Sequence, residues 1–360
     1  MARSRVFAAA LLLVSAATLA GCSSGPTAAV SSSHAPQTVT VTLLTHDSFA
    51  VDKRLLTTFE KQSGITVDIQ SVGDAGQLVS SAVLAAGAPS GDVLFGVDNS
   101  LAPKAVAAQV FSPYASPNLH NLVAPLQANT FGGVLTPVDY GDVCVVVDKT
   151  WFAAHHAVPP STLSDLTKPA FANLLVVEDP ALSSPGTAFL YATIARYGSA
   201  WKQYWTRLRN NGVQVANSWT QAYSGDFTAG GGKGSRPLVV SYGTDAAADI
   251  VYASNPKPST PRVAVMHDGC YRQIEYAGVL RGTAHPAAAG KVVDWLTSQS
   301  FQAGVPMAMF VYPARSGVAL PSVFTKWAPQ ATHPLQLPPA TVAANETSWL
   351  SDWGSVMGRA

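Results

Sequence analysis

Apolar and polar residues change their spacing several times in the first part of the chain. Alternation with a period of two predicts a strand, whereas apolar residues three or four positions apart predict a helix. On this basis we predict strands at residues 39–44, 65–69 and 92–97, with helices at 51–62 and 77–86 between them. Strands that alternate with helices are typical of an α/β domain with a parallel sheet. In such a doubly wound domain, ligands bind beyond the carboxyl ends of the strands.

Polar side chains follow each of these predicted strands, at residues 45–48, 71–74 and 98–100. Asp98 comes directly after an apolar strand, so its carboxylate is well placed to meet a cation or to accept hydrogen bonds. The alternative is a structural role, in which the segment caps the next helix through Asp98, Asn99 or Ser100.

A second candidate segment follows the predicted strand at residues 174–177. Ser184 and Pro185 suit the N-cap and the first position of a helix whose apolar run extends over 187–197. A helix N-terminus presents backbone N–H groups, so Ser183 and Ser184 are candidates to hold a phosphate or a carboxylate. The alternative is plain capping without any ligand.

Aromatic residues form a third set of candidates. Trp219, Tyr242 at the end of a predicted strand, and either Phe310 or Tyr312 can together form a cage for a flat or cationic ligand. The alternative for each of them is a place in the hydrophobic core. The glycine cluster at 229–235 lacks the spacing of a nucleotide-phosphate motif, and we predict a surface loop there.

The N-terminal residues have the pattern of a targeting signal. Two arginines precede an apolar run at residues 6–20 that is too short for a stable membrane span, and Leu-Ala-Gly leads into Cys22. This pattern resembles the lipobox of bacterial lipoproteins, so we predict a signal peptide at 1–21, a lipidated Cys22 and a flexible tether at 22–37. The protein would then be extracytoplasmic and lipid-anchored to the cell membrane. The alternative is an ordinary cleaved secretory signal with an incidental cysteine.

The composition narrows the function classes. The chain is 48% apolar and 12% charged, with a formal charge of +1. Removing the two N-terminal arginines with the signal leaves −1, and no basic patch indicates a nucleic-acid partner. No second long apolar run predicts a transmembrane helix.

Three cysteines are present, and lipidation of Cys22 leaves Cys144 and Cys270. Each of the two lies in a strand-like segment. Outside the cytoplasm a disulfide between them can persist, and two buried free thiols are the alternative.

Several of these segments together resemble a known family, the thiamine-binding periplasmic proteins of bacterial ABC importers. The resemblance extends from about Val39 to Trp353 and rests on segments that occur in order at residues 45–50, 96–99, 137–141, 147–149, 179–186, 218–223, 238–242 and 312–313. It implies the α/β type II periplasmic binding protein fold, in which two doubly wound lobes joined by a hinge close on a ligand. The lobe boundaries implied are 38–137, 138–272 and a return to the first lobe at 273–360.

The resemblance also implies a ligand and the residues that contact it. The ligand would be thiamine or one of its phosphate esters, carried as cargo without any cofactor or bound metal. The contacts would come from Asp98, Ser183, Trp219 and Tyr242. His46 and Phe310 depart from the family, which has tyrosine and tryptophan at these places, so another small cationic or phosphorylated ligand is the alternative.

The implied partners are a membrane permease and its ATPase, with the binding protein itself a monomer. A ferric-ion binding protein of the same fold commonly uses adjacent tyrosines, and the sequence has no Tyr-Tyr pair. An exported hydrolase would need a nucleophile with its base, but the sequence has neither G-x-S-x-G nor H-E-x-x-H. We therefore expect a binding protein rather than an enzyme.

Overall fold

The computed structural model describes residues 38–128, 131–231 and 233–359. The predicted signal peptide, the lipidated Cys22 and the tether lie outside the described residues.

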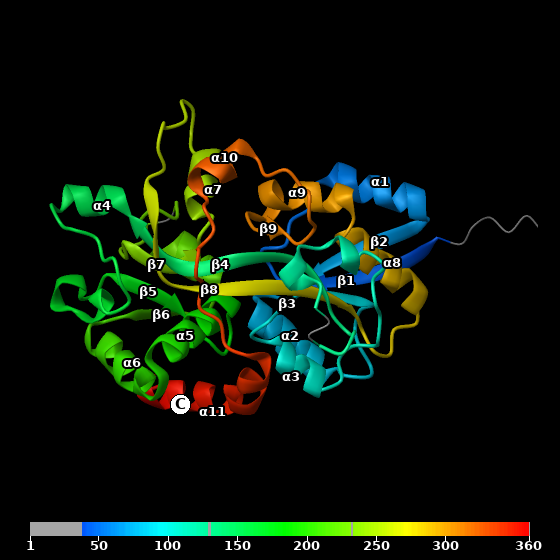
Figure 1. Cartoon of the computed structure of the whole chain (residues 1–360), viewed down its shortest axis with the longest axis horizontal. Helices are drawn as coiled ribbons and strands as arrows, with labels where there is room; N and C mark the ends of the chain where they lie inside the picture. The colour runs from blue at the N-terminus through cyan, green and yellow to red at the C-terminus, as the bar shows by residue number, and fades with distance from the viewer. Residues whose placement is uncertain (1–37, 129–130, 232, 360) are drawn as a thin grey trace, which may run out of the picture. The chain divides into compact units, whose positions relative to one another are not determined.

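A single mixed sheet runs through residues 38–359 (Figure 1). Its hydrogen-bonded order is β2-β1-β3-β8-β4-β7-β5-β6, and the short β9 pairs with β4. The strands are β1 (Val39–Thr45), β2 (Ile65–Ser71), β3 (Val93–Asp98), β4 (Thr136–Asp148), β5 (Leu175–Glu178), β6 (Gln214–Ala216), β7 (Leu238–Tyr242), β8 (Val263–Val279) and β9 (Tyr312–Pro313).

The first lobe is built on the parallel strands β1, β2 and β3, with α1 (Lys53–Ser63) and α2 (Ala75–Leu84) as the crossovers. This confirms the strand and helix order predicted from the spacing of apolar residues. Gly64 ends α1 in the left-handed conformation, with φ 70°, as its place after the apolar pattern indicates. The start of α2 lies two residues before the predicted one, because the Asp74 carboxylate accepts the Ala75 N–H and caps the helix there.

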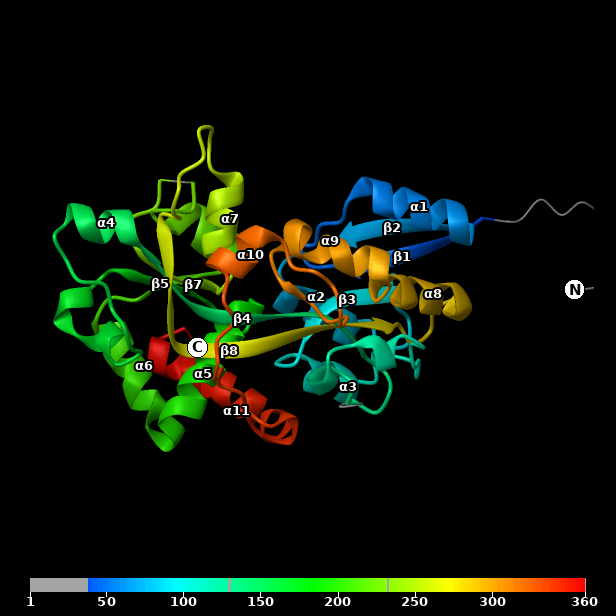
Figure 2. The same ribbon diagram turned by 45° about the horizontal axis from the view of Figure 1, so that its top comes forward.

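Two long antiparallel strands, β4 and β8, are common to both lobes (Figures 1 and 2). The first part of β4 pairs with β9, and the part after residue 142 pairs with β7. The end of β8 pairs with β3 of the first lobe. The strand-like segment that we predict around Cys270 covers residues 269–276. In the structure β8 also includes residues 263–268, which pair with β4 beyond the register shift at Cys144, and residues 277–279. The lobe boundaries at residues 137 and 272 stay a prediction.

The second lobe adds β5, β6 and β7, with α5 (Ser184–Tyr197) packed between the sheet and α6 (Trp201–Asn210). Its core contains the fully buried Tyr191, Tyr204 and Trp205. The first eleven residues of α5, from Ser184 to Ile194, are all buried. A helix surrounded by protein has no polar face, which is why its sequence shows an apolar run rather than an amphipathic pattern.

The remaining helices are α3 (Ala102–Ala107), α4 (Lys149–Ala154), α7 (Asp245–Tyr252), α8 (Pro286–Leu296), α9 (Gln299–Met309), α10 (Ser322–Trp327) and α11 (Pro339–Met357). The last of them, α11, packs on α6 of the second lobe and on α3 of the first (Figure 1).

Cys144 and Cys270 form a disulfide between β4 and β8, with their Cα atoms 4.3 Å apart. The bond lies where the register between the two strands shifts, so it fixes the pair of strands that both lobes share. It closes a loop of 126 residues, and constraining a loop of this length disfavours the unfolded chain.

Candidate functional site

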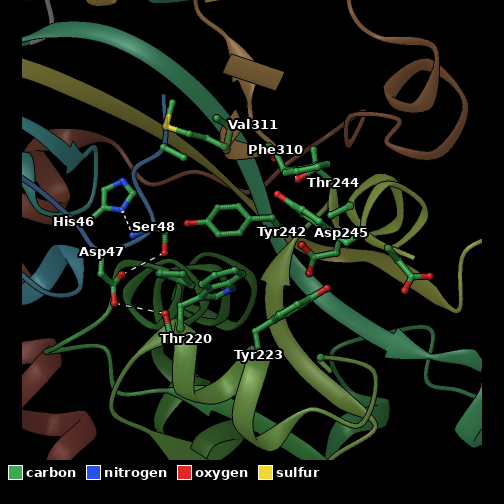
Figure 3. Close-up of a pocket in the computed structure, with 18 of the residues that line it drawn as sticks. His46, Asp47, Ser48, Thr220, Tyr223, Tyr242, Thr244, Asp245, Phe310 and Val311 are labelled. Carbon is green, nitrogen blue, oxygen red and sulfur yellow. Dashed lines mark hydrogen bonds between the residues drawn. The ribbon is translucent and has the colours of Figure 1, made fainter. Parts of the chain in front are cut away.

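A cavity of about 640 Å³ lies between the two lobes. This volume falls within the range of about 300–1,000 Å³ that is typical of small-molecule sites. Its wall combines the loop after β1 and the starts of α2 and α5 with η6 (Gln221–Asp226), α7 and the end of α9. Figure 3 labels residues from the loop after β1, from η6, from the start of α7 and from the segment after α9. Because the wall draws on both lobes, a ligand held there touches both of them.

Five aromatic side chains line the cavity. Trp219 and Tyr223 stack with ring centroids 5.1 Å apart, and Tyr242 meets Trp219 edge-on at 6.2 Å. At the rim, Tyr252 is 73% exposed and its ring lies 5.3 Å from that of Phe310. The arrangement supplies aromatic faces and edges to a flat or cationic ligand.

Local structure holds the rings of Tyr223 and Trp219 in place. Ala222 within the π-helical turn η6 and Phe227 directly after it are fully buried, and this turn presents Tyr223 to the cavity. Such turns are frequent at functional sites. Trp219 is fixed by its indole N–H, which donates to the Ser241 hydroxyl at 2.9 Å.

The charged side chains of the cavity wall are mainly acidic, with carboxylates from Asp47, Asp74, Asp245, Asp249 and Glu275. Two basic side chains stand against them. Arg262 lines the cavity but is held by Asp249, through contacts of 2.8 and 2.9 Å to one carboxylate oxygen. The second is His46, which is paired with Glu275.

His46 belongs to a buried chain of three titratable groups. Its Nε2 lies 3.5 Å from Oε1 of Glu275. Burial acts to lower the pKa of His46, but the Glu275 carboxylate outweighs it and raises that pKa. Burial and the negative charge of Glu275 raise the pKa of Asp139 well above its usual value. The arrangement therefore favours a protonated His46, an ionised Glu275 and a neutral Asp139.

Asp74 connects the lobes across the cavity. Its Oδ1 accepts the N–H of Ala75 at 2.7 Å, and its Oδ2 accepts the N–H of Trp219 at 2.9 Å. Nearby, the hydroxyl of Thr220 lies 3.5 Å from Asp47 Oδ2 (Figure 3). Since Trp219 and Thr220 belong to the second lobe, the two lobes are in contact at the cavity.

Asp245 is the first residue of α7 and is 4% exposed. Its Oδ2 is buried and has no hydrogen-bond partner among the described residues. Burial raises the pKa of Asp245 to about 7, while hydrogen bonding with the Ser241 side chain and the Tyr242 backbone acts in the opposite direction.

Asp98, predicted as a ligand contact, is fully buried and does not line the cavity formed by the described residues. Its Oδ1 accepts the N–H groups of Ser100 and Leu101 at 2.8 and 2.9 Å. Its Oδ2 accepts from Nε2 of Gln273 at 2.8 Å and from the Ser184 hydroxyl. Burial raises the pKa of Asp98 to about 6, although the Ser184 hydrogen bond acts to lower it. These contacts hold the turn between β3 and α3, whose N-cap is Leu101 without a side-chain cap hydrogen bond, so Asp98 has a structural role but does not cap α3.

The start of α5 also differs from the prediction. The helix begins at Ser184, so Ser183 is the flanking residue and Pro185 occupies the second helical position. Ser184 and Pro185 line the cavity, whereas Ser183 is fully buried outside the lining formed by the described residues.

Either Phe310 or Tyr312 was expected to contribute to the aromatic cage, and the structure places only one of them at the cavity. Phe310 lines the cavity. Tyr312 is 2% exposed and stacks on Tyr140, with its hydroxyl donating to the Ala328 carbonyl. Within the described residues it forms part of the core rather than of the cavity wall.

Of the predicted site residues, the structure thus brings His46, Ser184, Trp219, Tyr242 and Phe310 to one cavity. Sequence reasoning did not single out Tyr223, Asp245 or Glu275, and it included Asp74 only as one of the polar residues at a strand end. Asp74 stood in a segment already marked as a strand end, and Asp245 lies three residues after the strand that ends at Tyr242. Glu275 gave no signal, because it lies within a strand and reaches the cavity only through the pairing of β8 with β4.

Two further observations concern metal ions and membranes. Within the described residues, no group of three or more His, Cys, Asp or Glu side chains could hold a metal ion. In the same part of the chain, every helix is too short or too polar to cross a bilayer.

Curated relatives align over most of the chain. The thiamine-binding periplasmic protein of Escherichia coli (strain K12) is 29% identical over 327 residues, covering 89% of this chain and 94% of the relative. The protein of the same name from Brucella suis is 28% identical over 325 residues, covering 89% and 92%.

Solved structures show the same fold. A periplasmic thiamin binding protein superposes with a TM-score of 0.78 at 27% identity, covering 88% of this chain and 96% of that one. The iron-bound HitA of Pseudomonas aeruginosa superposes with a TM-score of 0.69 at 20% identity, covering 88% and 99%. The likeness to HitA shows the fold alone, and together these structures confirm the two-lobed α/β architecture.

A family model described as bacterial extracellular solute-binding protein matches residues 88–332, which is more than half of the chain. That segment contains β4 and β8, α5, and the residues Trp219, Tyr242 and Asp245 of the cavity. The family acts outside the cytoplasm by binding a small ligand. The chain belongs to the bacterial extracellular solute-binding proteins.

Proposed function

We propose that this protein captures thiamine or one of its phosphate esters outside the cytoplasm and delivers it to an ABC importer. The observation that carries the proposal is the cavity between the lobes, which combines five aromatic rings with five carboxylates. Similarity to thiamine-binding periplasmic proteins over 89% of the chain supports the choice of ligand.

The chemistry of thiamine matches the wall of the cavity. A cationic thiazolium ring and a flat aminopyrimidine ring suit the faces of Trp219, Tyr223 and Tyr242. Carboxylates attract the positive charge and accept hydrogen bonds from the amino group. Burial of both rings, together with these polar contacts, provides the free energy of capture.

Capture is coupled to closure of the lobes. The hydrogen bond from Trp219 N–H to Asp74 Oδ2 places an aromatic side chain of the second lobe against an acid of the first. A ligand between them favours the closed arrangement only by the difference between its affinities for the closed and open forms. No bond of the ligand changes, so we propose that the protein is not an enzyme and needs no cofactor.

The proposal extends to the rest of the transport system. A permease with its ATPase would receive the ligand from a monomeric binding protein. The lipobox-like sequence ending at Cys22 supports a lipid anchor there, which would hold the protein close to that permease.

Titration calorimetry tests the function on a soluble form that begins after Cys22. We expect thiamine to bind saturably at about one molecule per chain, and Trp219→Ala to weaken that binding. Trp151→Ala is the matched control, since Trp151 stacks on His155 and lies outside the cavity formed by the described residues. A folded protein that binds neither thiamine nor its esters would refute the proposal.

A further inference from the structure

Three helices begin at the cavity, and a carboxylate lies at or beneath the start of each. They are α2, α5 and α7, represented in the wall by Ala75, Ser184 and Asp245. A helix N-terminus attracts anions through its backbone N–H groups and its dipole, so a phosphate would be expected to bind at one of these three places.

The start of α2 is already occupied by Asp74. Its two carboxylate oxygens accept the N–H groups of Ala75 and Trp219, at 2.7 and 2.9 Å. An anion entering here would have to displace a carboxylate that is 6% exposed and connects the two lobes.

The start of α5 offers few donors to an anion. Ser184 donates its hydroxyl to the buried Asp98, and Nε2 of Gln273 contacts both of these side chains. The Ser183 N–H donates to the Asp179 carbonyl at 3.0 Å, and Pro185 has no N–H. Of the two serines that the sequence indicated as a phosphate site, Ser184 therefore donates to a buried carboxylate, and Ser183 lies outside the cavity lining formed by the described residues.

The start of α7 presents a carboxylate to the cavity instead of a donor. Asp245 Oδ2 is buried without a hydrogen-bond partner among the described residues. Figure 3 shows its carboxylate beside the Tyr242 and Tyr223 side chains. A buried polar atom without a partner is unfavourable, and an N–H group or a positive charge on a ligand would relieve it.

The two basic side chains of the cavity wall are already paired and are not available to bind a phosphate. Arg262 donates to Asp249 and to the Ala229 carbonyl, and His46 is paired with Glu275. No other Lys, Arg or His belongs to the cavity lining formed by the described residues. A phosphate ester would thus bring negative charge into a cavity whose own cations are already paired.

We infer that the cavity selects the unphosphorylated cation against its phosphate esters, and that Asp245 is the carboxylate that contacts the ligand's donor or positive charge. This inference rests on the proposed function and narrows its ligand.

The test is calorimetry of the soluble protein with thiamine, thiamine monophosphate and thiamine diphosphate. We expect the monophosphate to bind at least about tenfold more weakly than thiamine, and the diphosphate more weakly still. This ranking is measured on the unmodified sequence and does not depend on the folding of any variant. Esters that bind as tightly as thiamine would overturn the inference and leave the proposed function standing. Absence of binding by all three compounds would overturn both.

The Asp245→Asn variant tests the assigned residue. It keeps the shape of the side chain and removes its charge, so we expect thiamine affinity to fall about tenfold while the preference over the monophosphate narrows. Asp148→Asn is the matched control, because Asp148 is also a buried carboxylate at a helix start of the second lobe but lies outside the cavity lining. Circular dichroism establishes that both variants are folded. Unchanged thiamine affinity in a folded Asp245→Asn would remove Asp245 from the site.

Discussion

Asp98 and Asp245 are two buried carboxylates of the same protein with opposite surroundings. Asp98 is 0% exposed, and four donors occupy its two oxygens. Asp245 is 4% exposed, and its Oδ2 has no partner among the described residues. Burial raises the pKa of both groups, to about 6 and about 7.

The difference separates a structural carboxylate from a binding one. Asp98 joins β3 of the first lobe to α5 of the second through Ser184 and has no capacity left for a ligand. Asp245 lines the cavity and keeps an acceptor oxygen without a partner among the described residues, which we assign to the ligand. Burial and a raised pKa alone therefore do not identify a binding residue; the partners of each oxygen do.

The largest effect that we predict is on stability. Asp98→Ala leaves the Ser184 hydroxyl and the N–H groups of Ser100 and Leu101 without their acceptor, so we expect the free energy of unfolding to fall by about 3 kcal/mol. Urea unfolding followed by circular dichroism measures it. A fully stable Asp98→Ala protein that fails to bind thiamine would reverse the two roles and return Asp98 to the binding site.

A smaller effect is expected in binding. Trp219→Ala removes an indole that stacks on Tyr223 and meets Tyr242 edge-on. Loss of an aromatic anchor at the centre of a site costs about 2 kcal/mol, or about thirtyfold in Kd. Calorimetry of a variant with unchanged urea midpoint would separate this binding effect from the stability effect at Asp98. A loss of less than threefold would place Trp219 outside the contact surface.

The pH dependence of binding sharpens the comparison further. With a pKa of about 7, Asp245 gains negative charge between pH 6 and pH 8, and the ionised form attracts a cation. Thiamine affinity should therefore rise with pH, by up to about tenfold over this range. Loss of charge from His46 acts in the same direction, because its pKa is raised by Glu275. In the Asp245→Asn variant, thiamine affinity should rise less between pH 6 and pH 8 than in the wild type, because the contribution of Asp245 is lost. A wild-type affinity that falls from pH 6 to pH 8 would contradict the assigned charge.

The elements of the fold could be predicted from the sequence because their signals are local. The alternation in residues 39–44 and the glycine after α1 report on strand and helix positions directly. The length of β8 could not be predicted in the same way. Its first residues, from Val263, pair with the end of β4 at Asp148, more than a hundred residues away in the chain.

The site could be predicted only in part, for a related reason. Tyr242 was found because it ends a predicted strand, and Trp219 because it lies in a segment that resembles the family. Asp98 was predicted as a ligand contact and Asp245 was not, although both follow an apolar strand, because the sequence does not reveal which carboxylate has its oxygens already occupied. That depends on Gln273, which lies 175 residues after Asp98 and meets it only in the folded protein.

The smallest effect is predicted at the rim of the cavity. Tyr252 is 73% exposed, and its ring lies 5.3 Å from that of Phe310. A ring at the rim stays in contact with water when the ligand is bound, so Tyr252→Ala should weaken thiamine binding by less than about threefold, far below the loss at Trp219. The same titration, made alongside Trp219→Ala, provides the measurement. A loss as large as that of Trp219→Ala would mean that Tyr252 folds over the bound ligand, and recognition would then extend from the buried wall to the exposed rim.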